Sequence, residues 1–198
     1  MKLETIRVFA ASKLGWIKEQ QKKITAQDRE SPREYIERES HYVWGRRYLL
    51  RIVERESPPQ VQIRHNKIIL QVRRATGVER RREILDEWYR GQVRAAVQPM
   101  IAKWAALMGV RVERVFVRRM KTKWGSCSRR SASIRLNTDL AKKPPECLEY
   151  MVVHEMVHIL EPRHNARFIG LMDRLMPTWR FYRLMLNRLP VRHETWDY

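Results

Sequence analysis

Apolar residues recur at helical spacing over residues 3–24, with lysine and glutamate between them. The recurring apolar positions are Ile6, Phe9, Ala10, Leu14 and Ile17. This spacing places them on one face, so the segment predicts an amphipathic helix. The polar stretch that follows, residues 25–34, contains Pro32 and predicts a connector.

The next segments favour strands. Residues 41–54 are rich in aromatic and β-branched side chains, and we expect a strand that bends at Gly45. Residues 60–72 predict a β-hairpin, because His65 and Asn66 can adopt the positive φ angles of a tight turn.

A second helical pattern covers residues 79–108. Its apolar face consists of Ile84, Leu85, Trp88, Val93, Val97, Ile101, Trp104 and Leu107. Pro99 lies inside this pattern and is expected to kink the helix or split it, because proline has no amide hydrogen to donate. Gly109 is expected to end the helix in the left-handed conformation.

Two alternating segments, residues 111–120 and 131–140, predict strands joined by a polar tip at 128–131. Three further helices are delimited by proline or by a capping asparagine. We expect the first to open with Pro144 and Pro145 and to end before Pro162, the second to run from Asn165 to Met176, and the third from Thr178 to Leu189.

These segments predict one α+β domain with a small antiparallel or mixed sheet packed against helices. We expect a helical arm at 1–30, the domain itself at 31–190 and a tail at 191–198. The composition, with 43% hydrophobic residues, is that of a globular protein.

Composition also bears on the cellular setting. No apolar run approaches the roughly 18 residues of a membrane-spanning helix, and charges interrupt the N-terminal segment where a signal peptide needs an apolar core. The two cysteines, Cys127 and Cys147, are too few for a disulfide scaffold. We therefore expect a cytoplasmic protein with no membrane partner, while the oligomeric state leaves no mark in the sequence.

The chain is strongly basic, with a formal net charge of +19 from 41 Lys and Arg against 22 Asp and Glu. Such an excess favours polyanions such as nucleic acid or nucleotides, although a basic surface without a dedicated partner fits equally well. Residues 111–130 hold eight basic residues and one acid, and residues 163–192 hold seven and one. If both stretches flank one site, that site faces an anionic substrate or works beside one.

The residues with the clearest chemistry lie in the segment 152–168, VVHEMVHILEPRHNARF, which holds three of the six histidines. His154 and His158 are four residues apart on a predicted helix, so both imidazoles can bind one zinc ion at about 2.0–2.1 Å. Glu155 flanks this face, where it can reach a water on the metal. The alternative is structural, because the pattern H-E-x-x-H also arises by chance.

A catalytic zinc site needs three protein ligands and one open position. Glu161, His164 and Asp173 are the candidates for the third ligand. We favour His164, because Pro162 ends the helix before it and lets the chain turn back. The histidine spacing equals that of the H-E-x-x-H-x-x-G-x-x-H metalloproteases, but Glu161 replaces the glycine, so the turn must be built differently.

Three runs occur in a specific order along the chain. They are MKTKWGSCS (120–128), IRLNTDL (134–140) and YMVVHEMVHILEPRHNARFIGLMDRLMPTW (150–179). Together they resemble the YgjP-like metallopeptidase family, a distant relative of the SprT-like and WLM zincins. The resemblance implies a zincin-like fold, a zinc ion at His154, His158 and His164, and Glu155 as the catalytic glutamate.

The chain departs from this family in two respects. Members usually begin with a β-hairpin before the first helix, whereas this sequence starts at the helix, so either the start is truncated or the sheet is smaller. Lys123 stands where arginine is commoner.

The run KWGSC predicts a close backbone approach or a bulge at Gly125. In zincins an edge strand beside the metal often pairs with extended substrate. The candidate substrate-binding residues are then Arg118, Arg119, Lys121, Lys123, Trp124 and Gly125. Alternatively, Trp124 and Cys127 are packing residues, and we do not expect Cys127 to be a nucleophile, because no sequence feature explains a lowered pKa.

The favoured function is a zinc metallopeptidase in which Glu155 acts as general base on a polypeptide substrate. One alternative is a metal-dependent phosphohydrolase acting on nucleotides, such as a nucleoside triphosphate pyrophosphatase, because the same metal chemistry serves phosphoanhydrides. Another is a protease associated with DNA, and a third is a basic nucleic-acid-binding protein with a structural metal.

Overall fold

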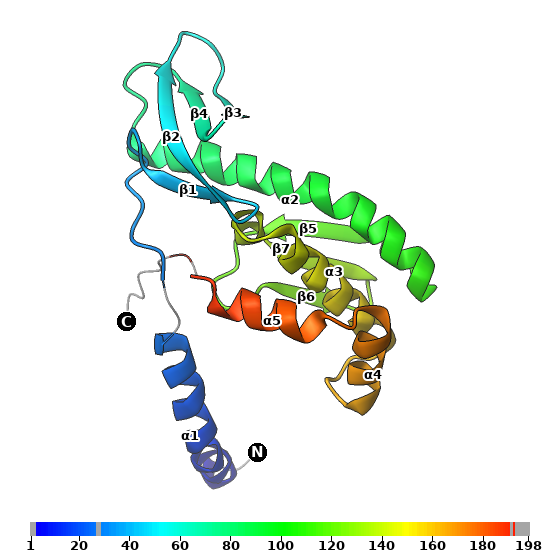
Figure 1. The fold of residues 1–198 in the computed structure, drawn as a ribbon. Helices are drawn as coiled ribbons and strands as arrows, with labels where there is room; N and C mark the ends of the chain where they lie inside the picture. Colours follow the sequence, from blue (N-terminus) through cyan, green and yellow to red (C-terminus); the bar gives the residue numbers. More distant parts are fainter. Residues whose placement is uncertain (1–2, 27–28, 191, 193–198) are drawn as a thin grey trace. The chain divides into compact units, whose positions relative to one another are not determined.

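The computed structural model describes residues 3–26, 29–190 and 192. The chain divides into two compact units, one of residues 32–186 and the other of residues 1–31 with 187–198 (Figure 1). The predicted tail at 191–198 lies outside the described residues except for Arg192.

Helix α1 spans Leu3–Ala26, as the apolar spacing predicts. Of its predicted apolar face, Phe9 and Leu14 are exposed, as are Val8 and Trp16. The side chains of the other members of that face lie outside those described.

The first sheet has four strands in the order β1-β2-β4-β3. The strands are β1 (Ser40–Val43), β2 (Arg46–Glu54), β3 (Gln60–Arg64) and β4 (Lys67–Val72). Strands β2 and β4 are parallel, while β1–β2 and β3–β4 are antiparallel. The predicted hairpin at 60–72 is confirmed, and His65 at its tip has a φ of 52°.

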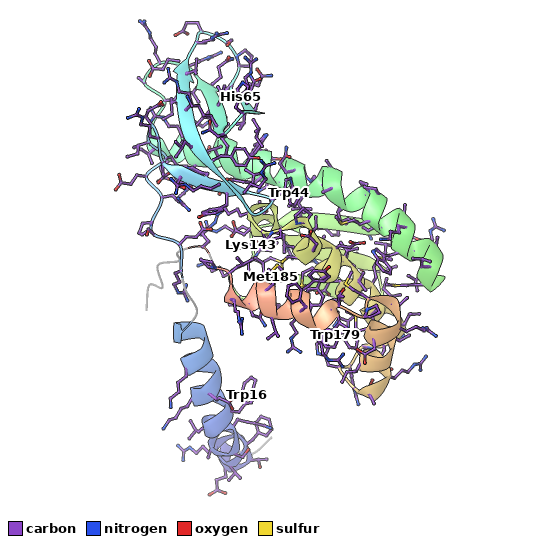
Figure 2. All side chains as sticks on the ribbon, in the orientation of Figure 1. Trp16, Trp44, His65, Lys143, Trp179 and Met185 are labelled. Atoms are coloured by element: carbon purple, nitrogen blue, oxygen red, sulfur yellow. The ribbon has the colours of Figure 1, made fainter. Side chains whose placement is uncertain are left out.

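The expected bend at Gly45 is a complete reversal that divides the predicted strand 41–54 into β1 and β2. Trp44 and Gly45 have φ angles of 50° and 76°, and paired positive φ angles favour the tight turns that join antiparallel strands. The Trp44 amide donates to the carbonyl of Ala141 at 2.7 Å, which ties the turn to the segment before Lys143. Trp44 and Lys143 are labelled in Figure 2.

Helix α2 spans Val78–Met108 without interruption, so Pro99 does not split it, and of the two expected effects only the kink stays a prediction. Pro99 faces solvent, while Val97 and Trp104 on either side of it are buried. Packing on both sides therefore maintains the helix across the missing hydrogen bond. Gly109 ends the helix with φ 64° and ψ 32°, as predicted.

The second sheet has the order β5-β7-β6, with β5 and β7 parallel and β6 antiparallel to β7. Its strands are β5 (Arg114–Arg118), β6 (Gly125–Ser128) and β7 (Ser133–Asn137). The predicted strand 131–140 ends early, at Asn137, because the Asn137 side chain accepts the Asp139 amide and starts the 3-10 helix η1 (Thr138–Lys142).

Three helices complete the chain, at the positions that proline and asparagine indicate. They are α3 (Pro145–Leu160), α4 (Ala166–Leu175) and α5 (Trp179–Arg188). Asn165 caps α4 by accepting the Phe168 amide at 3.0 Å. The α+β class with mixed sheets is confirmed, and α3 carries the H-E-x-x-H pattern.

The core of residues 32–186 lies between α2, α3 and the inner faces of the sheets (Figure 1). Leu50, Ile68 and Leu70 of the first sheet are almost fully buried, as are Leu136 of β7 and Val153 of α3. No helix within the described ranges is long and apolar enough to cross a membrane.

Gly45→Ala is expected to lower the free energy of unfolding by about 1–3 kcal/mol, because its positive φ disfavours a side chain. An added Cβ would also lie 3.0 Å from Cγ of Pro144. The matched control is Gly91→Ala in α2, where no atom lies within 4 Å of an added Cβ, and this change is expected to stabilise by about 0.5–1 kcal/mol. Urea denaturation measures both, and equal effects of the two changes would contradict the assigned turn.

Candidate metal centre

Helix α3 presents His154 and His158 one turn apart, with ring centroids 4.9 Å apart. The two histidines are half-buried, whereas Val152, Val153 and Val157 on the same helix are fully buried. Burial of these valines fixes the rotation of the helix, so both imidazoles are held at the edge of the core and not in open solvent.

His164 completes a cluster with these two histidines. Helix α3 ends at Leu160, and Glu161 then takes an extended conformation with φ −135°. The ring of His164 lies 5.0 Å from that of His154 and 4.7 Å from that of His158. One potential ligand atom from each histidine lies within 4.8 Å of the others.

The donor set of this cluster fits a divalent transition metal. The Nε2 atoms of His154 and His164 are 3.1 Å apart. Two nitrogens bound to one tetrahedral zinc at about 2.0–2.1 Å would be separated by about 3.3 Å. Among the residues that the structure describes, these three histidines are the group identified as able to hold such an ion.

Glu161 and Asp173, the other candidate ligands, point elsewhere. The Asp173 carboxylate accepts hydrogen bonds from Trp179 Nε1, at 2.7 Å, and from Arg180. Glu161 contributes through its main chain, because its carbonyl oxygen lies 3.1 Å from Nδ1 of His158. A proton on that Nδ1 leaves Nε2 of His158 free to bind a metal. Nδ1 of His154 is buried and has no hydrogen-bond partner among the described groups.

Phe168, in the first turn of α4, contacts all three imidazoles. Its ring centroid lies 5.1 Å from that of His154, 4.8 Å from His158 and 4.7 Å from His164. Its side chain is 2% exposed, so it forms an apolar floor under the cluster. In the sequence, the only sign of this residue's role is its position four residues after His164.

Two histidines of the cluster are held in the uncharged form that binds a metal ion. Burial, followed by the neighbouring histidines and Arg183, lowers the pKa of His154 to about 3. Burial, His158 and Arg183 also lower the pKa of His164. Both imidazoles are therefore neutral at pH 7, and neutral imidazole is the form that binds metal.

Glu155 lies in the gap between α3 and strand β6, where its side chain is 4% exposed. A Cβ added to Gly125 would lie 2.6 Å from Oε1 of Glu155 and 2.9 Å from its Cγ. The predicted close approach at Gly125 therefore exists, and the group that approaches is Glu155. Any larger residue at position 125 would displace this side chain.

Burial raises the pKa of Glu155 to about 8, while the positive charge of Lys123 lowers it. A carboxyl group in this range can exchange a proton near neutral pH, which is what a general acid–base group needs. A bound cation would favour the ionised carboxylate further.

Asn137 holds the loop that leads into β6. Its side-chain amide donates to the carbonyls of Met120 (2.7 Å) and Lys123 (2.9 Å). Its main-chain amide donates to the carbonyl of Trp124 at 2.9 Å. The conformation of the loop that carries Lys123 thus depends on one residue of the run IRLNTDL. Trp124 is half-buried, with Nζ of Lys143 5.8 Å from its ring centroid.

The predicted basic substrate-binding residues lie in different surroundings. Lys123 acts electrostatically on Glu155. Arg119 instead lines a hollow of about 750 Å³ between α2 and β3, together with Trp88 and Val61. For Arg118 and Lys121 the substrate-binding role stays a prediction.

Two other residues complete the surroundings of the cluster. Tyr150, 4% exposed, packs its ring 5.7 Å from that of His154, and burial raises its pKa to about 12, so it remains protonated. Arg183 of α5 lies close enough to lower the pKa values of His154 and His164, and its guanidinium carbon lies 6.0 Å above the Trp179 ring. In the sequence, Arg183 is one of seven basic residues between positions 163 and 192, and nothing sets it apart from the others.

Cys127 is not an activated nucleophile, as expected. Burial and the charge of Glu155 raise its pKa to about 11, so it is a thiol and not a thiolate at neutral pH. Its neighbour Arg129 donates from Nε to the carbonyl of Ile159 at 3.0 Å, which ties the end of β6 to the end of α3.

Comparison with known proteins identifies a family. The family described as "YgjP-like, metallopeptidase domain" matches residues 1–189. Among solved structures, the metallopeptidase zymogen abylysin of Pyrococcus abyssi has 17% identity and a TM-score of 0.43, covering 49% of this chain and 99% of that chain. The zymogen jannalysin of Methanocaldococcus jannaschii has 19% identity and a TM-score of 0.39, covering 48% and 92%. No curated protein matches the chain, and the family match alone carries the assignment.

Gly125→Ala is expected to lower turnover by about a hundredfold while zinc content is retained, because the added methyl group displaces Glu155 and not the histidines. Gly170→Ala in α4 is the matched control, since an added Cβ meets nothing within 4 Å there. Kinetics and metal analysis of both variants test this, and wild-type turnover in Gly125→Ala would contradict the close approach.

Metal-free Glu155→Gln is expected to be increasingly more stable than metal-free wild type as pH rises from about 5 to 8. The pKa of Glu155 is 4.5 as a free group and about 8 in the folded protein, so its contribution to stability is lost across this range. The difference in free energy of unfolding should grow by a few kcal/mol, on the order of 1.4 kcal/mol per pH unit at most. His154 titrates with the opposite sign, with stability lost as pH falls below 6.5, but it is common to both proteins. Denaturation in a chelator measures the difference, and a pH-independent value would contradict the buried carboxyl.

Proposed function

Because the chain belongs to the YgjP-like metallopeptidase domain family, we propose that it is a zinc peptidase with Glu155 as its general base. The observation that carries this proposal is the convergence of three imidazoles within 4.8 Å, beside a buried carboxyl group. A histidine-only site with a neighbouring acid is typical of catalytic zinc and unusual for structural zinc.

His154, His158 and His164 would hold the ion. When bound, zinc supplies Lewis acidity, which lowers the pKa of water and polarises a carbonyl group. Phe168 fixes the distance between the imidazole rings, and the Glu161 carbonyl fixes the orientation of His158. The ligand set is therefore organised before the ion arrives.

Glu155 takes the proton from the attacking water and later delivers it to the leaving amine. Its burial against Gly125 keeps the carboxyl group in one place and limits its hydration. Lys123 favours the ionised form of Glu155, which is the form that accepts a proton. The positive charge of Lys123 thus offsets part of the increase in basicity that burial gives to the Glu155 carboxylate.

Strand β6 is an edge strand of its sheet, since it pairs only with β7. An extended polypeptide can add to such an edge through main-chain hydrogen bonds, which demand little of the substrate sequence. Arg183 is suited to stabilise the negative charge that develops on the carbonyl oxygen, because it lies within electrostatic range of the cluster.

A nucleotide phosphohydrolase is the second candidate, because the cations that act electrostatically on His154 and on Glu155, Arg183 and Lys123, would also suit phosphate groups. The two candidates share the metal ligands and the base, so they differ only in the product formed.

Glu155→Gln is expected to lower turnover at least a hundredfold, and this variant is expected to bind zinc as the wild type does. His158→Ala is expected to lose zinc as well. Glu146→Gln is the matched control, because this exposed glutamate begins the same helix and should retain full activity.

The assay offers unfolded casein and nucleoside triphosphates to each zinc-loaded protein. Peptide fragments made by wild type and by Glu146→Gln, but not by Glu155→Gln, are the expected result. Released phosphate or pyrophosphate with the same dependence on Glu155 would replace the peptidase by the phosphohydrolase. Turnover that survives Glu155→Gln would contradict both the peptidase and the phosphohydrolase.

A further inference from the structure

The first sheet has a solvent-facing side that the metal centre does not use. Residues alternate along each strand, and Leu50, Ile68, Leu70 and Val72 point inward, with at most 1% exposure. Their strand neighbours therefore point outward. In the observed register, the outward rows are Tyr42 with Arg47; Ser40 with Leu49, Lys67 and Arg64; Arg51 with Ile69 and Gln62; and Val53 with Gln71 and Gln60.

Every charged side chain on this outward face is basic. The face carries the four cations Arg47, Arg51, Arg64 and Lys67, and none of its residues is acidic. Arg51 pairs with Glu37, 3.3 Å away. Within the described ranges, no ion pair is found for Arg47 or Lys67, and Arg64 donates from Nε to the neutral Gln62 side chain at 3.1 Å.

Lys67 and Arg64 are directly opposite one another across β3 and β4. Like charges at such positions repel and destabilise a sheet by about 0.2–1 kcal/mol. An anion bound between them would remove this repulsion. The arrangement is thus unfavourable in the free protein and favourable in a complex with a polyanion.

Apolar side chains lie between these cations. Leu49, Val53 and Ile69 are half-buried on the outward face, and Tyr42 is 41% exposed beside Arg47. A sheet face that combines an exposed aromatic ring, flat apolar area and unpaired cations can stack unpaired bases and bind phosphates at once. The stacked bases of a duplex could not reach such a surface, and this favours a single strand.

We propose that the outward face of strands β1–β4 binds single-stranded nucleic acid, with Arg47, Arg64 and Lys67 on the phosphates and Tyr42 stacked on a base. This surface goes beyond the proposed peptidase function and does not depend on it, since no residue of the metal centre takes part. It is consistent with the net charge of +19.

The test uses the full-length chain and a fluorescent oligothymidylate of about 16 nucleotides, the upper end of common site sizes. The triple variant Arg47→Gln, Arg64→Gln, Lys67→Gln is expected to bind at least tenfold more weakly. The slope of log Kd against log salt should fall by about 2, since each phosphate contact contributes about 0.7 for single strands. The matched control, Arg111→Gln, Arg130→Gln, Arg174→Gln, changes the net charge equally at exposed positions elsewhere and should bind within twofold of wild type.

Tyr42→Ala is expected to weaken binding about fivefold or more without changing the salt slope, and Tyr42→Phe should restore affinity, because it keeps the ring. Binding should persist in Glu155→Gln and in a chelator, so failure of the peptidase proposal leaves this one intact.

Three results would overturn the proposal. One is an equal loss in both triple variants, which would mean general charge attraction. Another is tighter binding to a duplex of the same length with no effect of Tyr42→Ala. The third is loss of binding to phosphatidylserine-containing vesicles in the first triple variant while its oligonucleotide affinity is unchanged, which would assign the surface to an anionic membrane.

Discussion

The close approach of strand β6 to helix α3 is the constraint on which the candidate site depends. The strand backbone at position 125 meets the side chain of Glu155, whose carboxyl group occupies the space that a Cβ would need. This contact buries Glu155, and strand β6 forms one wall of the site. His154 and His158 lie beside Glu155 on the surface of helix α3. Arg129 and Asn137 hold the two ends of that wall, one to helix α3 and the other to the preceding loop.

Burial has opposite effects on the pKa of the acid and on that of the histidine, and only the effect on the histidine favours a metal ion. Loss of hydration disfavours charge in either group, so the pKa of His154 falls and that of Glu155 rises. The metal-free site therefore holds neutral imidazoles and a carboxyl group able to keep its proton. A divalent ion would favour the ionised form of Glu155 and so reverse the effect of burial on this residue. His154 and His164 would keep their protonation state, since imidazole binds metal in its neutral form.

Patterns within a few neighbouring residues predicted most of this molecule. Asn165 and Gly109 ended their elements as expected, because capping is local. Pro99 does not split its helix, because residues on both sides of the proline are buried, which only the packed structure reveals. The sequence does not reveal the positions of Phe168 and Arg183 beside the histidines, for a related reason. A phenylalanine on an amphipathic helix and an arginine in a basic stretch look ordinary until the tertiary arrangement brings them to the histidines.

The aromatic ring beneath the three imidazoles acts as a rigid spacer, because it touches each of them and is itself enclosed. Two of these histidines lie on a helix and the third lies beyond its end, so they share no backbone element that would hold their rings together. An enclosed ring of fixed size limits how far the three imidazoles can shift towards one side of the cluster. One hydrocarbon side chain thus helps to keep the nitrogens at their spacing, although it donates no electrons to an ion.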